Sequence, residues 1–80
     1  MSEVVVLWQA FSQVSYSKKD AETGKFLHHT LLGKGGLHEK PEDAWSEAQK
    51  LLDDAERFVR GSEGAQRYSG IAGICPGGFL

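Results

Sequence analysis

The sequence predicts an α+β fold, in which an antiparallel β-hairpin or a three-stranded sheet packs against one amphipathic helix. Two patterns predict it. Apolar and polar side chains alternate through residues 4–32 on both sides of a glycine-containing turn, which is typical of paired strands. Residues 41–60 carry apolar side chains at spacings of three and four, which is typical of a helix with one apolar face. Because neither element is stable alone, the helix is expected to cover the hairpin.

The first strand is expected over residues 4–16, with one face buried. Gln9, Phe11 and Gln13 have the parity of the other face, so their side chains are expected outside the core. A stretch of this length is unusual for one strand, which favours a bend or bulge at residues 10–12. The apolar and aromatic residues of the buried parity are Val4, Val6, Trp8, Ala10, Val14 and Tyr16.

The turn that follows depends on Asp20 and Gly24. An aspartate carboxylate accepts hydrogen bonds from backbone amides just ahead of it, and glycine adopts the left-handed conformation that closes such a hairpin. Residues 26–32 alternate again and are expected to form the second strand.

The helix is expected from Pro41 to Arg60. Proline is favoured in the first turn, Glu42 and Asp43 complement the positive end of the helix dipole, and Gly61 is favoured at the C-terminal end. The apolar stripe of this helix consists of Ala44, Trp45, Ala48, Leu51, Leu52, Ala55, Phe58 and Val59.

The last part of the chain is rich in glycine, with six of the ten glycines in residues 61–80. Because two strands under one helix make a thin fold, residues 67–74 are expected to form a third strand. Residues 75–80 are expected to be a flexible tail or a short arm over the core. The predicted core consists of Val4, Val6, Trp8, Val14, Phe26, Trp45, Ala48, Leu51, Leu52, Ala55 and Phe58.

The length of 80 residues predicts a single small α+β domain over residues 1–80. Cys75 is the only cysteine and cannot form an internal disulfide, which favours a reducing, cytoplasmic setting. No apolar run approaches the length that crosses a membrane, and the start lacks a signal-peptide pattern. No membrane association is therefore expected.

No residue pattern indicates catalysis or a cofactor. The loop 33–36 lacks the spacing and the hydroxyl residue of a phosphate-binding Walker loop. Cys75 has no orienting base near it in sequence. The candidate metal ligands lack the spacing of a zinc site, and they are His28, His29, His38 and Cys75. The chain is therefore expected not to be an enzyme and to need neither metal nor cofactor.

Charge and exposed side chains predict a protein-binding surface. Residues 39–60 carry seven acidic and four basic side chains, which favours attraction to a basic protein surface and repulsion from nucleic acid. The predicted anchor beside this charge is Phe11 with Gln9 and Gln13. The free edge of the sheet is a second predicted contact, through pairing with another copy as a homodimer. The predicted partner-binding residues of the helix are Glu42, Asp43, Glu47, Asp53, Asp54 and Glu56.

This small, acidic, motif-free α+β chain resembles, as a class, the phage-encoded inhibitors that include anti-CRISPR proteins. The resemblance implies an inhibitor that occludes a larger nucleic-acid-handling complex, protein or ribonucleoprotein, at a basic surface. The stretch 41–48, followed by Leu51 and Leu52, is also similar to the Glu-Ala-rich helix that follows the hairpin in HicB-type antitoxins.

The alternative function is nucleic-acid binding, or an antitoxin-like role, through the lysines of the hairpin and the loop. The run 33–36 before the helix resembles the glycine-lysine loop of double-stranded RNA-binding domains, which implies RNA binding. That family continues with a lysine-rich helix start, whereas residues 38–43 of this chain are largely acidic. Direct nucleic-acid binding is therefore the less favoured expectation, and its residues are Lys18, Lys19, Lys25 and Lys34.

Overall fold

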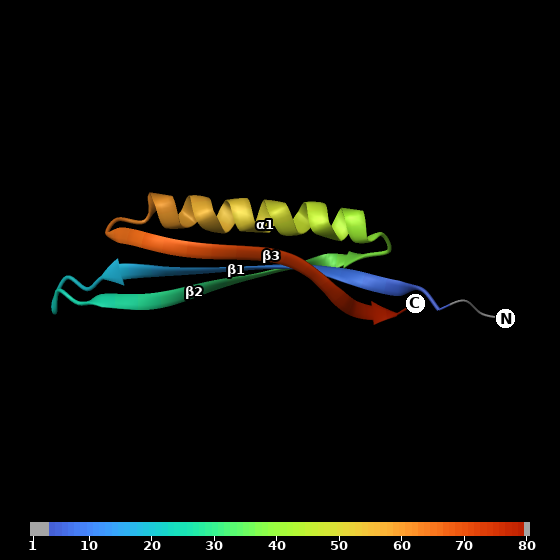
Figure 1. Cartoon of the computed structure of the whole chain (residues 1–80), viewed down its shortest axis with the longest axis horizontal. Coiled ribbons are helices and arrows are strands. Elements are labelled where there is room, and N and C mark those ends of the chain that lie inside the picture. Colours follow the sequence, from blue (N-terminus) through green and yellow to red (C-terminus); the bar gives the residue numbers. More distant parts are fainter. Residues whose placement is uncertain (1–3, 80) are drawn as a thin grey trace.

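The computed structural model describes residues 4–79, which form three strands and one helix. The three strands make one antiparallel sheet in the order β2-β1-β3, and the helix α1 covers one of its faces (Figure 1). The α+β fold is thereby confirmed, in its three-stranded form. The elements are β1 (Val6–Lys19), β2 (Phe26–His38), α1 (Pro41–Gly61) and β3 (Ala65–Phe79).

The turn between β1 and β2 is the one expected from Asp20 and Gly24. The Asp20 amide donates to the Lys25 carbonyl at 2.8 Å, and the Gly24 amide donates to the Asp20 carbonyl at 2.9 Å. The Asp20 carboxylate accepts from the Glu22 amide at 2.9 Å. Gly24 has φ 71°, a conformation that favours glycine.

The central strand β1 pairs antiparallel with both β2 and β3. Its register against β2 shifts between Gln9 and Phe11, close to the bulge expected at residues 10–12, but the extra residue lies in β2, between Lys34 and Leu37. β3 is longer than expected and runs to Phe79, which pairs with Val6. Residues 75–79 are therefore a paired end of this strand, and Leu80 lies outside the described residues.

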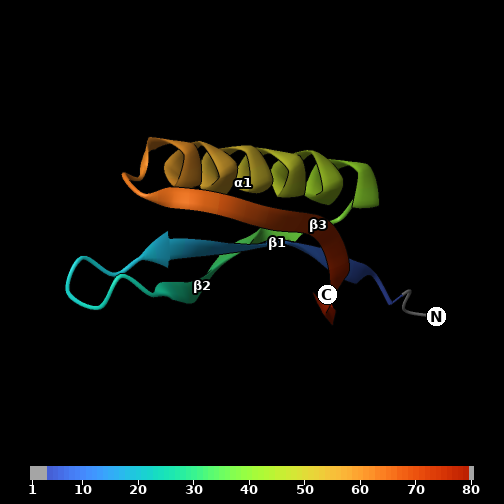
Figure 2. The same ribbon diagram turned by 60° about the vertical axis from the view of Figure 1, so that its left-hand side comes forward.

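The helix α1 connects β2 to β3, which lie on opposite sides of β1. It begins at Pro41, where the Ala44 amide donates to the Lys40 carbonyl at 3.3 Å. At the other end the Ser62 hydroxyl donates to the Phe58 carbonyl at 2.9 Å. Figure 2 shows α1 running along the sheet on one side only.

The core between α1 and the sheet is built largely from small side chains. Leu51, Leu52 and Ala55 are half-buried, as are Val6 and Trp8 in β1. The expectation that alternate apolar residues of β1 face the helix is confirmed for the middle of the strand, where Ala10 and Val14 are buried. The buried apolar residues are Ala10, Val14, Ala44, Ala48 and Val59.

Four residues of the predicted core are exposed instead, and their placement there was wrong. Val4 precedes β1, and Phe26 lies at the hairpin end on the face of β2 that is turned away from α1. Trp45 and Phe58 lie on α1 but are 47% and 57% exposed. Each adjoins a buried residue, and successive helical side chains are turned by about 100°, so both point past the margin of the contact.

Glycines on the sheet allow α1 to lie close to it. A β-carbon on Gly70 would lie 2.8 Å from Cδ1 of Leu52, and one on Gly33 would lie 3.7 Å from Leu51. A β-carbon on Gly35 would overlap the carboxylate of Glu47. The short distance between α1 and the sheet therefore depends on glycines in the sheet and on alanines in the helix.

The molecule is elongated, with principal extents of 63 × 17 × 14 Å. A helix of 21 residues is about 31 Å long, whereas strands of 14–15 residues span about 45–50 Å. The turn between β1 and β2 accordingly extends beyond the C-terminal end of α1 (Figure 1). Among residues 4–79, no element covers the hairpin end or the face of the sheet opposite α1.

Candidate functional site

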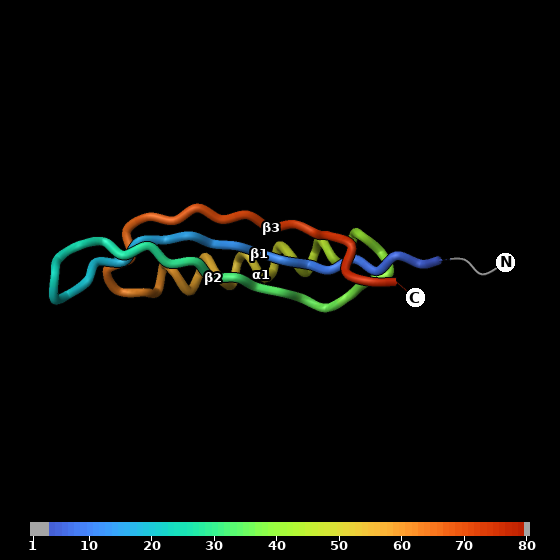
Figure 3. Tube along the Cα trace, turned by 90° about the horizontal axis from the view of Figure 1, so that it is seen from below, coloured from blue at the N-terminus to red at the C-terminus, as the bar shows by residue number. Residues whose placement is uncertain are grey.

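The face of the sheet opposite α1, hereafter the open face, is the candidate site. Figure 3 shows the three strands from this side, with α1 behind them. Paired residues of β2, β1 and β3 form five successive rows of side chains on it. From the bulged end to the hairpin end, the rows are Leu37–Gln9–Cys75, Lys34–Phe11–Gly73, Leu32–Gln13–Ile71, Thr30–Ser15–Ser69 and His28–Ser17–Arg67.

The middle of the open face carries two exposed aliphatic side chains. Leu32 is 73% exposed and Ile71 is 57% exposed, on the two sides of Gln13. In the next row, a β-carbon on Gly73 would lie 2.7 Å from Cζ of Phe11, so the ring lies over the glycine. These two rows place two exposed aliphatic side chains, on either side of Gln13, and one aromatic ring on the same uncovered stretch of the described sheet.

Three hollows lie along the open face. One of about 320 Å³ is lined by residues of the bulged end, including Gln9, Phe11, Leu32 and Lys34. The other two, of about 280 and 260 Å³, lie at the hairpin end and share Ser17, His28 and Arg67. No acidic residue lines any of the three.

Charge is segregated between the sheet and the rest of the molecule. None of the three strands contains an aspartate or glutamate, although they carry Lys18, Lys19, Lys34 and Arg67. Within residues 4–79, every acidic side chain lies on α1 or in a connecting segment. The net charge of −2 therefore conceals an acidic helix side and a cationic sheet.

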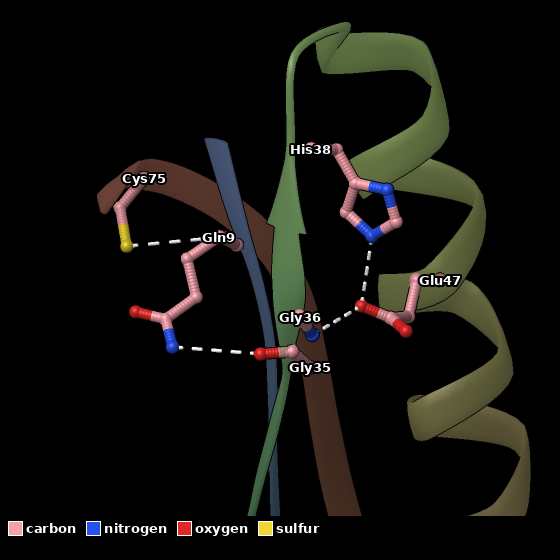
Figure 4. Close-up of polar contacts among 6 residues, drawn as sticks. All are labelled: Gln9, Gly35, Gly36, His38, Glu47 and Cys75. Carbon is pink, nitrogen blue, oxygen red and sulfur yellow. Dashed lines mark hydrogen bonds and ion pairs between the residues drawn. The ribbon is translucent and has the colours of Figure 1, made fainter. Parts of the chain in front are cut away.

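The structure separates the two predicted groups of partner-binding residues. Gln9, Phe11 and Gln13 lie on the open face, whereas the acidic residues lie on α1, across the sheet from them. Figure 4 shows this for Gln9 and Glu47, which lie on opposite sides of the sheet. One flat partner surface cannot contact both groups at once.

The acidic residues of α1 also differ among themselves. The Glu56 carboxylate pairs with Arg60 at 3.6 Å, and the Asp54 carboxylate lies 3.9 Å from Arg57. Glu47 is held by β2. Three of the six predicted residues therefore have partners within the described chain, and the other three, all exposed, are Glu42, Asp43 and Asp53.

Glu47 connects the first half of α1 to β2. Its Oε1 accepts a hydrogen bond from the Gly36 amide at 2.7 Å and lies 3.0 Å from Nε2 of His38 (Figure 4). The bond to His38 is the main cause that lowers the pKa of the Glu47 carboxyl below its ordinary value of 4.5. The predicted partner-binding residue Glu47 is thus engaged in holding the fold.

Glu47→Gln should cost stability near neutral pH but not in acid. Because the pKa of Glu47 is lowered in the folded state, its charge stabilises the fold above the ordinary value of 4.5 and stops doing so as pH falls through the lowered pKa. Urea unfolding should show the wild type more stable than the variant at about pH 7, with the difference shrinking as the pH falls below the ordinary value of 4.5. Glu63→Gln, at an exposed carboxylate, is the control and should show no such change. A Glu47→Gln difference that is constant with pH would contradict the role of the charge.

The lysines of the nucleic-acid alternative do not form one cluster. Lys18, Lys19 and Lys25 lie at the hairpin end, on the part of β1 and the turn that projects beyond α1. Lys34 lies on the open face, in the row of Phe11. The hairpin end also carries Asp20 and Glu22, which offset part of its positive charge.

Groups with chemical reactivity are sparse in the described part of the chain. Cys75 is exposed, and its thiol lies 3.9 Å from the Gln9 carbonyl. Among residues 4–79, no three histidine, cysteine, aspartate or glutamate side chains are grouped so as to hold a metal ion. The single helix described, α1, is not apolar enough over its length to cross a membrane.

The chain matches no protein-family model, and neither a curated protein nor a solved structure matches it. Its function is therefore inferred from its surface. The residues that sequence reasoning missed are Leu32, Ile71 and Arg67. For Ile71 and Arg67 the sequence held a signal, because residues 65–79 carry a cation and no acid. Which residues of β2 lie in the same rows as these two follows only from the order of the strands.

Proposed function

We propose that this chain is a small protein-binding module without a catalytic role, and that the open face is its contact surface. The observation that carries the proposal is the pair of exposed aliphatic side chains, Leu32 and Ile71, which lie on either side of Gln13 in the central row of the open face. Covering apolar surface is favourable by about 25 cal/mol per Å². Protein contact surfaces typically have such an apolar centre with a polar rim.

The charges around this centre indicate the kind of partner. Lys34 lies one row from the aliphatic row and Arg67 lies two rows from it on the other side. Because no acidic side chain lines the hollows of this face, an acidic rim on the partner meets no repulsion. The partner surface that fits is apolar at its centre and acidic around it.

An inhibitory role belongs to the same proposal. A bound module of this size would block the surface it covers on a larger complex. The exposed carboxylates Glu42, Asp43 and Asp53 would supply a second contact, to a basic surface of a nucleic-acid-handling complex. Two partner surfaces on opposite sides of one sheet are compatible, because the open face and α1 do not overlap.

Capture of binding proteins by immobilised chain should depend on the open face. We expect Leu32→Asp with Ile71→Asp to lower the amount of each captured protein at least about tenfold, because the two carboxylates replace the apolar centre of the contact. Proteins from the native host are quantified on wild-type and variant columns. Both positions are exposed, and circular dichroism checks that the variant remains folded.

Two further variants separate the alternatives. Asp43→Asn with Asp53→Asn removes charge from α1, and Lys18→Gln with Lys19→Gln removes it from the hairpin end. If only the helix variant loses captured protein, the contact surface lies on α1, and the proposal is contradicted. Binding of labelled nucleic acid that weakens steeply with salt and is lost in the hairpin variant would favour the nucleic-acid alternative.

A further inference from the structure

The hairpin end of the open face contains a hollow that lies apart from Leu32 and Ile71 and is lined in part by hydroxyl, imidazole and guanidinium groups. The hollow of about 280 Å³ is lined by the complete rows Thr30–Ser15–Ser69 and His28–Ser17–Arg67. A neighbouring hollow of about 260 Å³ shares Ser17, His28 and Arg67 and adds Phe26. Neither includes an acidic residue, and the groups of the two linings that can donate hydrogen bonds include the serine and threonine hydroxyls and the Arg67 guanidinium.

The floor of this hollow is made of hydroxyl groups. Ser15 and Ser17 come from the central strand, and Ser69 and Thr30 come from the two neighbouring strands. Small side chains at these positions leave room above the sheet, where larger residues would fill it. The hydroxyls of Ser15, Thr30 and Ser69 can each donate one hydrogen bond to a bound group.

Two nitrogen-containing side chains, His28 and the cationic Arg67, lie at the rim on either side of Ser17. The Ser17 hydroxyl and Nδ1 of His28 are hydrogen-bonded at 3.0 Å, which fixes that end of the ring and leaves Nε2 for another partner. Arg67 lies in the same row, across Ser17. The other arginines, Arg57 and Arg60, each lie within 4 Å of a carboxylate on α1, whereas Arg67 has no ion pair among the described residues.

We propose that this hollow binds a phosphate group carried by a phosphorylated side chain of the protein partner. Arginine has five N–H donors in a planar fork suited to phosphate oxygens, and hydroxyl groups complete the coordination. A tetrahedral phosphate offers more acceptor oxygens than a carboxylate, which suits a site with donors from three strands. This inference rests on the proposed function, since it assigns the charged part of the partner to one end of the same face.

A phosphorylated protein fits this face better than a nucleic acid does. The row next to the hollow is Leu32–Gln13–Ile71, two residues or about 7 Å further along the strands. Aliphatic side chains accept apolar residues of a peptide but do not provide the aromatic platform on which bases stack. Successive phosphates of a nucleic acid would also require cations along the whole face, whereas in its five rows only the second and the fifth carry one, Lys34 and Arg67.

O-phospho-L-serine is the probe, and serine and glutamate are the reference compounds. In an amide NMR titration of the full chain we expect shift changes confined to residues 15–17, 28–30 and 67–69. Binding of an isolated phosphoamino acid should be in the millimolar range, with serine showing none and glutamate at least about threefold weaker. Arg67→Ala should weaken binding at least about tenfold, while the matched Arg57→Ala on α1 should leave it unchanged.

Other outcomes would overturn the inference. Equal weakening by Arg57→Ala, or shifts centred on Lys18, Lys19 and Lys25, would show a general charge effect. Tighter binding of a single-stranded oligonucleotide than of phosphoserine at the same residues would assign the hollow to nucleic acid. If phosphoserine fails to bind while the Leu32 and Ile71 variants still lose captured protein, the phosphate site is rejected and the protein-binding function stands.

Discussion

Val14→Asp should unfold the protein. Val14 is 0% exposed, between the sheet and α1, and a carboxylate there would be buried with no partner. The cost is about 4 kcal/mol or more, while the stability of 80 residues is about 4–12 kcal/mol in total. We expect the variant to lose its cooperative thermal transition and its near-ultraviolet circular dichroism signal.

Gln13→Asp is the matched control for this change. Gln13 adjoins Val14 in β1 but is exposed on the open face, where its new charge remains in water. Its unfolding free energy should lie within about 1 kcal/mol of the wild type. Val14→Ala, which keeps the site apolar, should still fold and lose about 2 kcal/mol. Equal destabilisation by the two aspartates would mean that the two faces of β1 are assigned incorrectly.

Gly70→Val should destabilise the protein by about 3 kcal/mol without unfolding it. A β-carbon at this position would lie 2.8 Å from Cδ1 of Leu52 and 3.3 Å from Cγ2 of Val14. Since both neighbours belong to the packed contact with α1, the helix must shift outward or the side chains must leave their preferred rotamers. Urea unfolding monitored by helix ellipticity measures the loss as a lower midpoint with an unchanged slope.

Gly78→Val provides the comparison within the same strand. A β-carbon on Gly78 would meet only Leu37, at the ordinary contact distance of 3.9 Å. Because a β-branched residue suits a strand, this variant should be neutral or slightly more stable. Destabilisation of both variants by the same amount would indicate a general effect of glycine replacement in β3 and not the closeness of α1.

The elements of the fold were largely predictable because their signals are local. The alternation in β1, the Asp20 and Gly24 turn and the three- and four-residue spacing of α1 each reflect neighbours along the chain. The width of the stripe that α1 buries depends instead on how the helix packs against the sheet. Trp45 and Phe58 match the spacing, but alanines and glycines bring α1 so close to a narrow sheet that only the centre of the stripe is covered.

Glycine in β3 gave a misleading signal for the same reason. An isolated glycine weakens a strand, which argued for a short strand ending near residue 74. In the structure, Gly70 admits α1 on one face and Gly73 lies beneath the Phe11 ring on the other. Their cost in chain entropy is offset by contacts that exist only once the strands are assembled.

The candidate site was predictable only in part. Parity placed Gln9, Phe11 and Gln13 outside the core correctly, because alternation in β1 is unambiguous. In β2 two leucines are adjacent, so a shift of one residue exchanges which of them is exposed, and only the register with β1 places Leu32 on the open face. Arg67 joins His28 solely because β1 lies between β2 and β3.

The position of β1 in the middle of the sheet has a consequence for the order of folding. β1 meets β2 across a short turn, so this hairpin requires little loss of chain entropy and forms early. β1 meets β3 only through contacts such as Val6 with Phe79, which are far apart in the chain and slow to form. Until they form, the second edge of β1 stays unpaired and open to strands of other molecules. The late docking of β3 is thus the step at which folding competes with aggregation, and high protein concentration during refolding will penalise the yield at that step.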